Sequence, residues 1–375
     1  MNKSFFRLIL PLSVAIFSMF FGAGNTIYPI LLAVKAKSHF GWSFFGLILT
    51  AILGPLIGLI GGALFKGKSI DFFSRAGKWP GIILITASLS LLGPFAVLPR
   101  CVSVAYSAVQ AVIPNMSLWF FVTLFCLITW FCSYKKKVLL SALGYILSPA
   151  LIACLLMMIY KGWNAPNIIQ QSSLTSLGAF FEGLSTGYDT MDLIASIIFS
   201  AGIWGMVSQL FPKNPEKILK TTLISGSLAC LMLALIYLGL SQAAAVYADQ
   251  LIGLPRQELM TRLAFITLGP KLGMVANAAV ALACLTTVIG LTMTISDIIS
   301  KEIMPKKISY KTSVMSILIV TAFMTHIGFE TISVVIHSVV QICYPIIIVL
   351  TIYNITYKLR SFKTEELKER KSLRA

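Results

Sequence analysis

The chain consists of long apolar runs separated by short polar connections. A helix needs about 20 apolar residues to cross the core of a bilayer, and most of these runs are that long. We predict about ten transmembrane helices, at residues 5–34, 42–65, 80–111, 116–133, 138–160, 179–210, 218–244, 272–300, 309–327 and 329–356. The first, third and sixth runs exceed the length of one crossing and contain Gly or Pro. The fourth and ninth are short.

The composition supports this pattern. Of the 375 residues 57% are hydrophobic and only 11% are charged, against roughly 25% charged in a soluble domain. So few charges cannot cover a soluble surface, which excludes a soluble enzyme or a free nucleic-acid binder despite the net charge of +17. The seven cysteines all fall in apolar stretches and form no CxxC pair, so neither a disulfide framework nor a zinc site is expected. The sequence predicts an all-α polytopic membrane protein.

The lysines and arginines predict an orientation. With the N-terminus in the cytoplasm, most of the 30 basic residues lie in connections on the cytoplasmic side, as the positive-inside rule requires. Both termini are therefore expected inside, and this bias explains the basic composition without a nucleic-acid partner. We expect a single membrane transport domain over residues 1–357 and a charged cytoplasmic tail over residues 358–375.

The ten predicted helices divide into two sets of five, at about 5–160 and 179–356. An odd number of crossings inverts the second set relative to the first, and the two sets resemble each other in layout. Helices 1 and 6 are both long and interrupted, and helices 4 and 9 are both short. This layout is typical of an inverted-repeat transporter, whose site lies near the midplane where the two broken helices meet.

The interruption in helix 1 runs from Phe21 to Pro29. Gly22 and Gly24 weaken the helix by about 1 kcal/mol each relative to Ala, Asn25 is polar at membrane depth, and Pro29 removes a backbone donor. Freed carbonyls there can bind a cation, and the new helix N-terminus can hold a carboxylate. The alternative is a GxG face that packs against another helix.

The interruption in helix 6 runs from Ser185 to Asp192 and contains two acids, Asp189 and Asp192. Each costs about 2.5–3.5 kcal/mol at the centre of a bilayer, which indicates a function or a paired partner. Alternatively, the two acids lie near the outer surface and cap the second half-helix, an interpretation that fits Asp192 better than Asp189.

Arg100 lies inside the third span, in the segment from Gly93 to Arg100. A lone arginine there must meet an acid, carbonyl groups, water or a substrate carboxylate, unless its helix is kinked and it extends to the lipid headgroups. In helix 8, Thr286 and Thr287 are candidate ligands of a small hard cation, although neighbouring threonines also bond back to their own helix. His337, in helix 10, is expected to have a packing or interface role.

Four motifs together resemble the branched-chain amino acid:cation symporter family (LIVCS) of the amino acid–polyamine–organocation superfamily. They are Phe21-Gly-Ala-Gly-Asn-Thr-Ile-Tyr-Pro29, Gly93-Pro…Pro99-Arg100, Gly187-Tyr-Asp-Thr-Met-Asp192 and Leu285-Thr-Thr-Val-Ile-Gly-Leu-Thr292. The resemblance implies the LeuT-type 5+5 inverted-repeat fold with helices 1 and 6 broken. It also implies sodium-driven uptake of leucine, isoleucine and valine across a bacterial cytoplasmic (inner) membrane. No enzyme activity, no cofactor besides the coupling ion and no obligate protein partner is expected.

The resemblance also implies roles for individual residues. The substrate would lie against the unwound parts of helices 1 and 6 and near the third span, at Gly22, Ala23, Gly24, Asn25, Tyr188, Asp189, Thr190 and Arg100. Na⁺ would be held by the carbonyls of Ser18 and Phe21 and by three residues at ligand spacing on helix 8, namely Ala283, Thr286 and Thr287. Members of the family commonly have about twelve spans, whereas ten are predicted here and the LeuT-type core needs only ten.

Two alternatives remain open. The first is an H⁺-coupled amino acid permease of broader apolar specificity, including Met, with an acid such as Asp189 carrying the proton. The resemblance implies that a lysine in helix 5 replaces the sodium ion in some proton-coupled relatives, so the absence of a lysine inside helix 5 (138–160) favours Na⁺. The second, remote alternative is an intramembrane aspartyl protease, since Tyr188-Asp189 is similar to its YD element. The second acid of such a protease, in a GxGD context on a separate helix, is not present.

Overall fold

The computed structural model describes residues 3–134, 138–166, 169–212, 214–305 and 307–372, and within these ranges the chain is helical with no strand. The predicted all-α class is confirmed. The α-helices are α1 (Lys3–Phe20), α2 (Ala23–Ala36), α3 (Phe40–Ala51), α4 (Leu53–Leu64), α5 (Ser69–Phe73), α6 (Lys78–Leu92), α7 (Val97–Gln110), α8 (Leu118–Tyr134), α9 (Val138–Trp163), α10 (Ser176–Asp189), α11 (Asp192–Leu210), α12 (Pro215–Val246), α13 (Ala248–Leu251), α14 (Leu259–Ile298), α15 (Tyr310–Ile327) and α16 (Phe329–Ser372). Short 3₁₀ turns include η3 (Arg256–Glu258).

Several helical segments are long and apolar enough to cross a membrane. Within the described residues seven such segments occur, at Ala23–Leu64, Lys78–Gln110, Ser176–Leu210, Pro215–Val246, Arg256–Ile303, Tyr310–Ile327 and Phe329–Ser361. Shorter apolar helices cover Leu8–Phe20, Leu118–Tyr134 and Pro149–Trp163. The protein is therefore a multi-pass membrane protein. Each of the ten predicted spans overlaps at least one helix of the structure, while the number of crossings stays a prediction.

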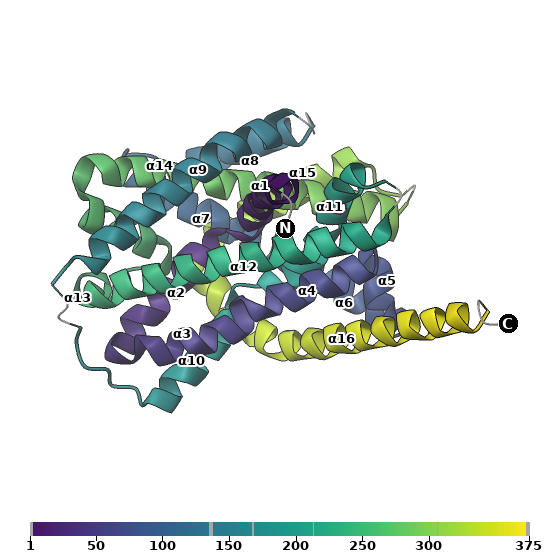
Figure 1. The fold of residues 1–375 in the computed structure, drawn as a ribbon. Coiled ribbons are helices and arrows are strands. Elements are labelled where there is room, and N and C mark those ends of the chain that lie inside the picture. The colour runs from purple at the N-terminus through teal and green to yellow at the C-terminus, as the bar shows by residue number, and fades with distance from the viewer. Residues whose placement is uncertain (1–2, 135–137, 167–168, 213, 306, 373–375) are drawn as a thin grey trace.

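The helices of the two predicted halves pack against each other around a buried centre (Figure 1). Helix α10 packs along α3, α11 along α4, and α14 along both α7 and α9. The long helix α12 contacts α9, α1 and α2. This interleaving places the α1–α2 junction and the α10–α11 junction inside the bundle, where neighbouring helices surround both.

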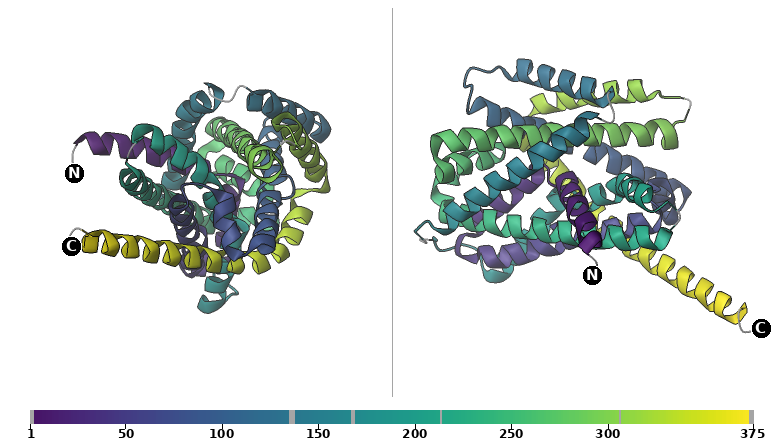
Figure 2. Two further views of the ribbon diagram at one scale, coloured as in Figure 1. Left: turned by 90° about the vertical axis from the view of Figure 1, so that its right-hand side faces the viewer. Right: turned by 45° about the horizontal axis from the view of Figure 1, so that its top comes forward.

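Within α14 the backbone leaves helical geometry at Gly269 (φ 75°, ψ −179°), directly before Pro270, so two helices meet there and the second begins close to residue 272, where the eighth span is predicted to start. One helix boundary differs from the sequence expectation. Helix α16 continues past residue 357 to Ser372 because the tail contains no Gly or Pro and consists mostly of good helix formers. In the left view of Figure 2, α1 and the C-terminal part of α16 project from the same side of the bundle. Residues 373–375 of the expected tail lie outside the described residues, as do five of the lysines assigned to the cytoplasmic side in the predicted orientation, namely Lys135, Lys136, Lys137, Lys213 and Lys306.

Glycines allow α3 and α10 to pack closely. A Cβ atom at Gly183 would overlap the carbonyl oxygen of Ser43, one at Gly46 would overlap the carbonyl of Phe180, and one at Gly187 would overlap the hydroxyl of Thr50. Small residues serve this purpose between membrane helices, since dispersion and close backbone approach replace the hydrophobic effect there. The α3–α10 contact therefore fixes the position of α10 and of the junction that follows it.

We expect Gly183→Ala to destabilise the protein, because the added methyl group forces two backbones apart. The cost should be about 1–3 kcal/mol, the usual range for overpacking, and should lower the thermal midpoint in detergent. Gly41→Ala, on α3 where a Cβ meets no atom within 4 Å, is the matched control and should leave the midpoint unchanged or raise it. Equal midpoints for the two variants would show that the contact is looser than described.

Candidate functional site

The α1–α2 junction consists of two residues, Phe21 and Gly22. Helix α1 ends at Phe20 and α2 begins at Ala23, while Gly22 is extended with φ −113° and ψ −167°. The backbone N–H of Gly22 donates to Oδ1 of Asn25 at 2.9 Å. This side-chain bond satisfies a donor that the helix ladder leaves free, so the interruption stays short. The sequence expectation that residues 22–25 unwind together is therefore wrong in extent, since Ala23, Gly24 and Asn25 form the first turn of α2.

The α10–α11 junction is equally short. Helix α10 ends at Asp189, Met191 is left-handed with φ 58°, and α11 begins at Asp192. The hydroxyl of Thr190 donates to the carbonyl of Gly187 at 2.9 Å and accepts from the N–H of Asp192 at 3.4 Å. The expected interruption from Ser185 to Asp192 is wrong in extent for the same reason as at the first junction. Tyr188 and Asp189 complete α10, and only Thr190 and Met191 lie between the two helices.

A cavity lies between the two junctions. Its backbone side is formed by Gly22, Ala23 and Gly24. The polar side chains that line it are those of Asn25, Arg100, Asp189, Thr190, Asp192 and Thr287, and the apolar ones are those of Met19, Phe20, Leu92, Val97, Ala195, Phe199 and Leu291. All the predicted substrate residues except Tyr188 therefore meet at one cavity. The ring of Tyr188 packs instead against that of Tyr344, with centroids 4.8 Å apart.

Arg100 is buried at this cavity. Its side chain is only 3% exposed, so it does not extend to the headgroups. Nη1 donates to the backbone carbonyl of Asp189 at 3.1 Å. Nε and Nη2 have no hydrogen-bond partner within the part of the chain that the structure describes. The guanidinium group therefore retains donors for an anion that enters the cavity.

Asp192 is bound by neutral groups. Nδ2 of Asn25 donates to Oδ2 of Asp192 at 2.7 Å and also contacts the hydroxyl of Tyr237, which donates to the same Oδ2 at 3.3 Å. Asp192 is 3% exposed, and no ion pair involves it among the described residues. The interpretation of Asp192 as a cap near the outer surface is therefore wrong, since its carboxylate is buried beside the cavity.

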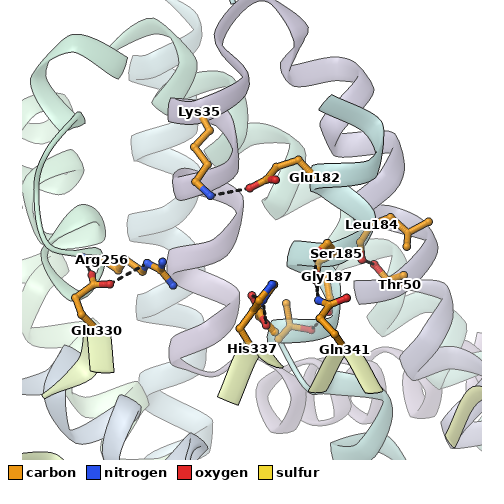
Figure 3. A network of polar contacts seen from close by, with 12 residues as sticks. Lys35, Thr50, Glu182, Leu184, Ser185, Gly187, Arg256, Glu330, His337 and Gln341 are labelled. Carbon is orange, nitrogen blue, oxygen red and sulfur yellow. Dashed lines mark hydrogen bonds and ion pairs between the residues drawn. The ribbon is translucent and has the colours of Figure 1, made fainter. Parts of the chain in front are cut away.

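Asp189 has a partner that the sequence interpretation missed. Nδ1 of His337 lies 2.9 Å from both carboxylate oxygens of Asp189, and Nε2 of Gln341 donates to the hydroxyl of Ser185 at 2.9 Å. His337 and Gln341 are one turn apart on α16 and face α10 (Figure 3). Their spacing in an otherwise apolar helix is the signal that could have revealed this contact.

Two further ion pairs accompany this contact (Figure 3). Nζ of Lys35 lies 2.6 Å from Oε1 of Glu182 and joins α2 to α10. Nε of Arg256 lies 3.1 Å from Oε2 of Glu330 and joins η3 to the start of α16. Both pairs are partly exposed, so each contributes little energy by itself. Together with the contact between His337 and Asp189 they link four elements, α2, α10, η3 and α16.

The predicted sodium ligands are only partly gathered. The hydroxyls of Thr286 and Thr287 donate to the carbonyl of Ala283 at 2.8 Å and 3.0 Å, the back-bonding that threonines make in helices. Thr287 also lines the cavity, and its methyl group lies 3.4 Å from the position of a Cβ at Gly22. Helix α14 thus meets the α1–α2 junction at Thr287, whereas Ser18, Phe21, Ala283 and Thr286 do not line the cavity.

Known proteins match this chain over most of its length. A family model described as branched-chain amino acid transport protein matches residues 7–370. A proposed branched-chain amino acid carrier protein of Staphylococcus saprophyticus is 30% identical over 354 residues, covering 89% of this chain and 78% of the relative. A similarly described protein of Staphylococcus aureus is 28% identical over 352 residues, with the same coverage.

Solved structures share the arrangement of helices. The inward-facing conformation of Mhp1 superposes with a TM-score of 0.62 at 14% identity, covering 88% of this chain and 72% of that chain. A manganese transporter of Eremococcus coleocola gives a TM-score of 0.58 at 12% identity, covering 95% and 80%. At these identities the likeness establishes the fold alone, which is the LeuT-type fold expected from the sequence.

The contact between Asp189 and His337 predicts non-additive stability effects. His337→Leu leaves a buried carboxylate without its partner and should cost about 1–2 kcal/mol, discounted because His337 is 44% exposed. Adding Asp189→Asn should recover part of that loss. His326→Leu is the control, since His326 bonds to the carbonyl of Ala322, and its effect should simply add to that of Asp189→Asn. Thermal midpoints in detergent are measured for the single and double variants of each pair. If the effects of His337→Leu and Asp189→Asn simply add, the contact is contradicted.

Proposed function

The chain belongs to the branched-chain amino acid transport protein family, and from this premise we propose that it imports leucine, isoleucine and valine together with Na⁺ by alternating access. Its family consists of transport proteins rather than enzymes, which leaves no place for the protease alternative. The identity of the substrates, the coupling ion and the direction of transport are the parts that we propose.

The proposal rests on one observation: the cavity has a polar, charged side and an apolar side. Arg100, Asp192 and Asn25 supply charge and hydrogen bonds, while Leu92, Phe199 and other apolar residues supply a hydrocarbon wall. An aliphatic amino acid has the same division, with a charged backbone and an apolar side chain. An apolar wall separates ligands that differ by one methylene by only about 1–3 kcal/mol. Leucine, isoleucine and valine should therefore compete, and methionine should bind more weakly.

Sodium would act at the contact between α14 and the α1–α2 junction. We assign its ligands to the carbonyls of Ser18, Phe21 and Ala283 and to the hydroxyl oxygens of Thr286 and Thr287. The proximity of Thr287 to Gly22 supports this placement, and broken membrane helices supply carbonyl ligands of this kind. Because the ion and the substrate would stabilise the same state, each should raise the affinity for the other by the same factor.

Proton coupling is the second candidate. The contact between Asp189 and His337 favours it, since an acid and an imidazole at the edge of the cavity can exchange a proton with an aqueous path. Such a carrier would take a broader range of apolar amino acids, including methionine.

We place the protein in the cytoplasmic membrane of a bacterium with both termini inside. The distribution of basic residues supports this orientation. Residues 1–357 then form one transport domain made of two inverted halves, 5–160 and 179–356, and residues 358–375 form a cytoplasmic tail. In this orientation the pairs Lys35–Glu182 and Arg256–Glu330 lie on the outer side of the cavity. Alternating access would require these contacts to separate when the cavity opens outward.

Uptake of radiolabelled leucine into proteoliposomes tests the proposed function. An inward Na⁺ gradient at equal pH should drive accumulation, an imposed pH gradient without Na⁺ should not, and excess isoleucine or valine should abolish the signal. Accumulation driven by the pH gradient alone would establish the proton-coupled candidate instead. Absence of leucine accumulation under either gradient, in vesicles that retain folded protein, would reject both.

The sodium assignment predicts the effect of Thr287→Ala. Loss of one hydroxyl ligand should raise the half-saturating Na⁺ concentration about 10-fold, corresponding to the roughly 1–2 kcal/mol of one such contact, with the maximal rate less affected. Thr294→Ala is the matched control, because Thr294 makes the same back-bond on α14, to the carbonyl of Gly290, but does not line the cavity. An unchanged Na⁺ requirement in Thr287→Ala would remove Thr287 from the site.

A further inference from the structure

Two residues of opposite charge at the cavity, Arg100 and Asp192, make no ion pair in the described chain. Arg100 hydrogen-bonds to a backbone carbonyl and keeps Nε and Nη2 without partners, while Asp192 interacts with the neutral side chains of Asn25, Tyr237 and Thr190, among the residues that the structure describes. Both side chains are 3% exposed, and both line the same cavity. A buried charge without a partner costs several kcal/mol. Each of these groups is therefore poised to bind an ion of opposite sign.

The two groups are also held apart. No ion pair joins Arg100 to Asp192 in the described chain. Arg100 on α7 is directed to the carbonyl at the end of α10, whereas Asp192 is bound by side chains from α2 and α12. Asp189 is less available than Asp192, because His337 contacts both of its carboxylate oxygens. The cavity therefore presents one available cation and one available anion at separate positions.

From this separation we propose that Arg100 binds the carboxylate and Asp192 the ammonium group of an α-amino acid. The inference rests on the proposed function and assigns the part of the site that recognises the backbone of the substrate. A zwitterion brings both missing counter-charges at once and no net charge. Its side chain then faces the apolar wall that includes Leu92, Phe199 and Leu291. The site takes unmodified α-amino acids and discriminates against analogues that lack either charged group.

The hydrogen bonds around Asp192 favour an ammonium group over a metal cation. Because the N–H of Gly22 donates to Oδ1 of Asn25, the amide must present its Nδ2 donor to Asp192. Nδ2 and the hydroxyl of Tyr237 both donate to Oδ2, and the side chain of Thr190 also interacts with the carboxylate. A carboxylate surrounded by neutral donors can accept a further N–H donor at a remaining lone pair. A sodium ion requires several converging oxygen atoms, and two donors directed at the carboxylate oppose that arrangement.

Three ligands that differ in one charged group test the proposal. Leucine carries both groups, 4-methylpentanoate lacks the ammonium group, and leucinamide lacks the carboxylate. Calorimetric titration of the purified protein in detergent at saturating Na⁺ gives the affinity for each. Wild type should bind leucine at least about 10-fold more tightly than either analogue, as expected when one charged hydrogen bond is lost. Asp192→Asn should weaken leucine binding about 10- to 100-fold while leaving 4-methylpentanoate binding unchanged. Arg100→Gln should weaken leucine binding and spare leucinamide.

Glu182→Gln provides the comparison on α10. It also removes a carboxylate, but one that pairs with Lys35 and does not line the cavity, so the ratio of leucine affinity to 4-methylpentanoate affinity should stay at the wild-type value. Thermal midpoints verify that each variant is folded. If Asp192→Asn weakens all three ligands equally, Asp192 is structural and the proposal is wrong. If it raises only the Na⁺ requirement and leaves leucine affinity intact at saturating Na⁺, Asp192 binds the cation and the proposal is equally wrong.

A wrong substrate assignment can be recognised separately. In that case the wild-type protein itself binds none of leucine, isoleucine and valine. The charge pair still predicts that some α-amino acid binds, and that its analogue without the ammonium group is discriminated through Asp192. Titration with the remaining proteinogenic amino acids tests this, and failure of all of them to bind would overturn the assignment of both charges.

Discussion

Every backbone donor and acceptor inside a bilayer must find a partner within the protein, and the structure depends on how this requirement is met at two places. At each of the two junctions beside the cavity, only two residues lie outside the helices. Asn25 satisfies a free N–H at one junction, and Thr190 does so at the other. The surrounding helices exclude lipid from both. A cavity lined by main chain and polar groups can therefore exist at the centre of an apolar bundle.

The charged residues at the cavity have different surroundings, and the differences explain their roles. Asp189 contacts His337, so its charge serves the contact between α10 and α16. Arg100 and Asp192 bond to uncharged groups and retain capacity for a ligand. Helix packing sets this division, because the glycine contacts between α3 and α10 fix where Asp189 ends its helix. The short segment around the α10–α11 junction therefore contains the glycine that packs on α3, the threonine that caps α11 and the acids that line the cavity.

The sequence predicted the class of fold and most of the residues that meet at the cavity, because Gly, Pro and Asp are rare and costly inside membrane helices. It overestimated the extent of both junctions, since side-chain capping by Asn25 and Thr190 depends on geometry that a linear pattern does not contain. It left a surface cap open as an alternative for Asp192 and expected a packing or interface role for His337 without identifying its partner. The contacts that it did not predict join residues more than a hundred positions apart, from α2 to α11 and from α10 to α16.

The side chain of Asn25 has a consequence for how the two halves of the molecule move. Its planar amide accepts a bond within one junction through Oδ1 and donates to the other through Nδ2. A half-turn of the amide would set donor against donor at Gly22 and acceptor against acceptor at Asp192. A rotation of the amide would therefore disturb both bonds together, so the side chain of Asn25 ties the geometry of one junction to that of the other.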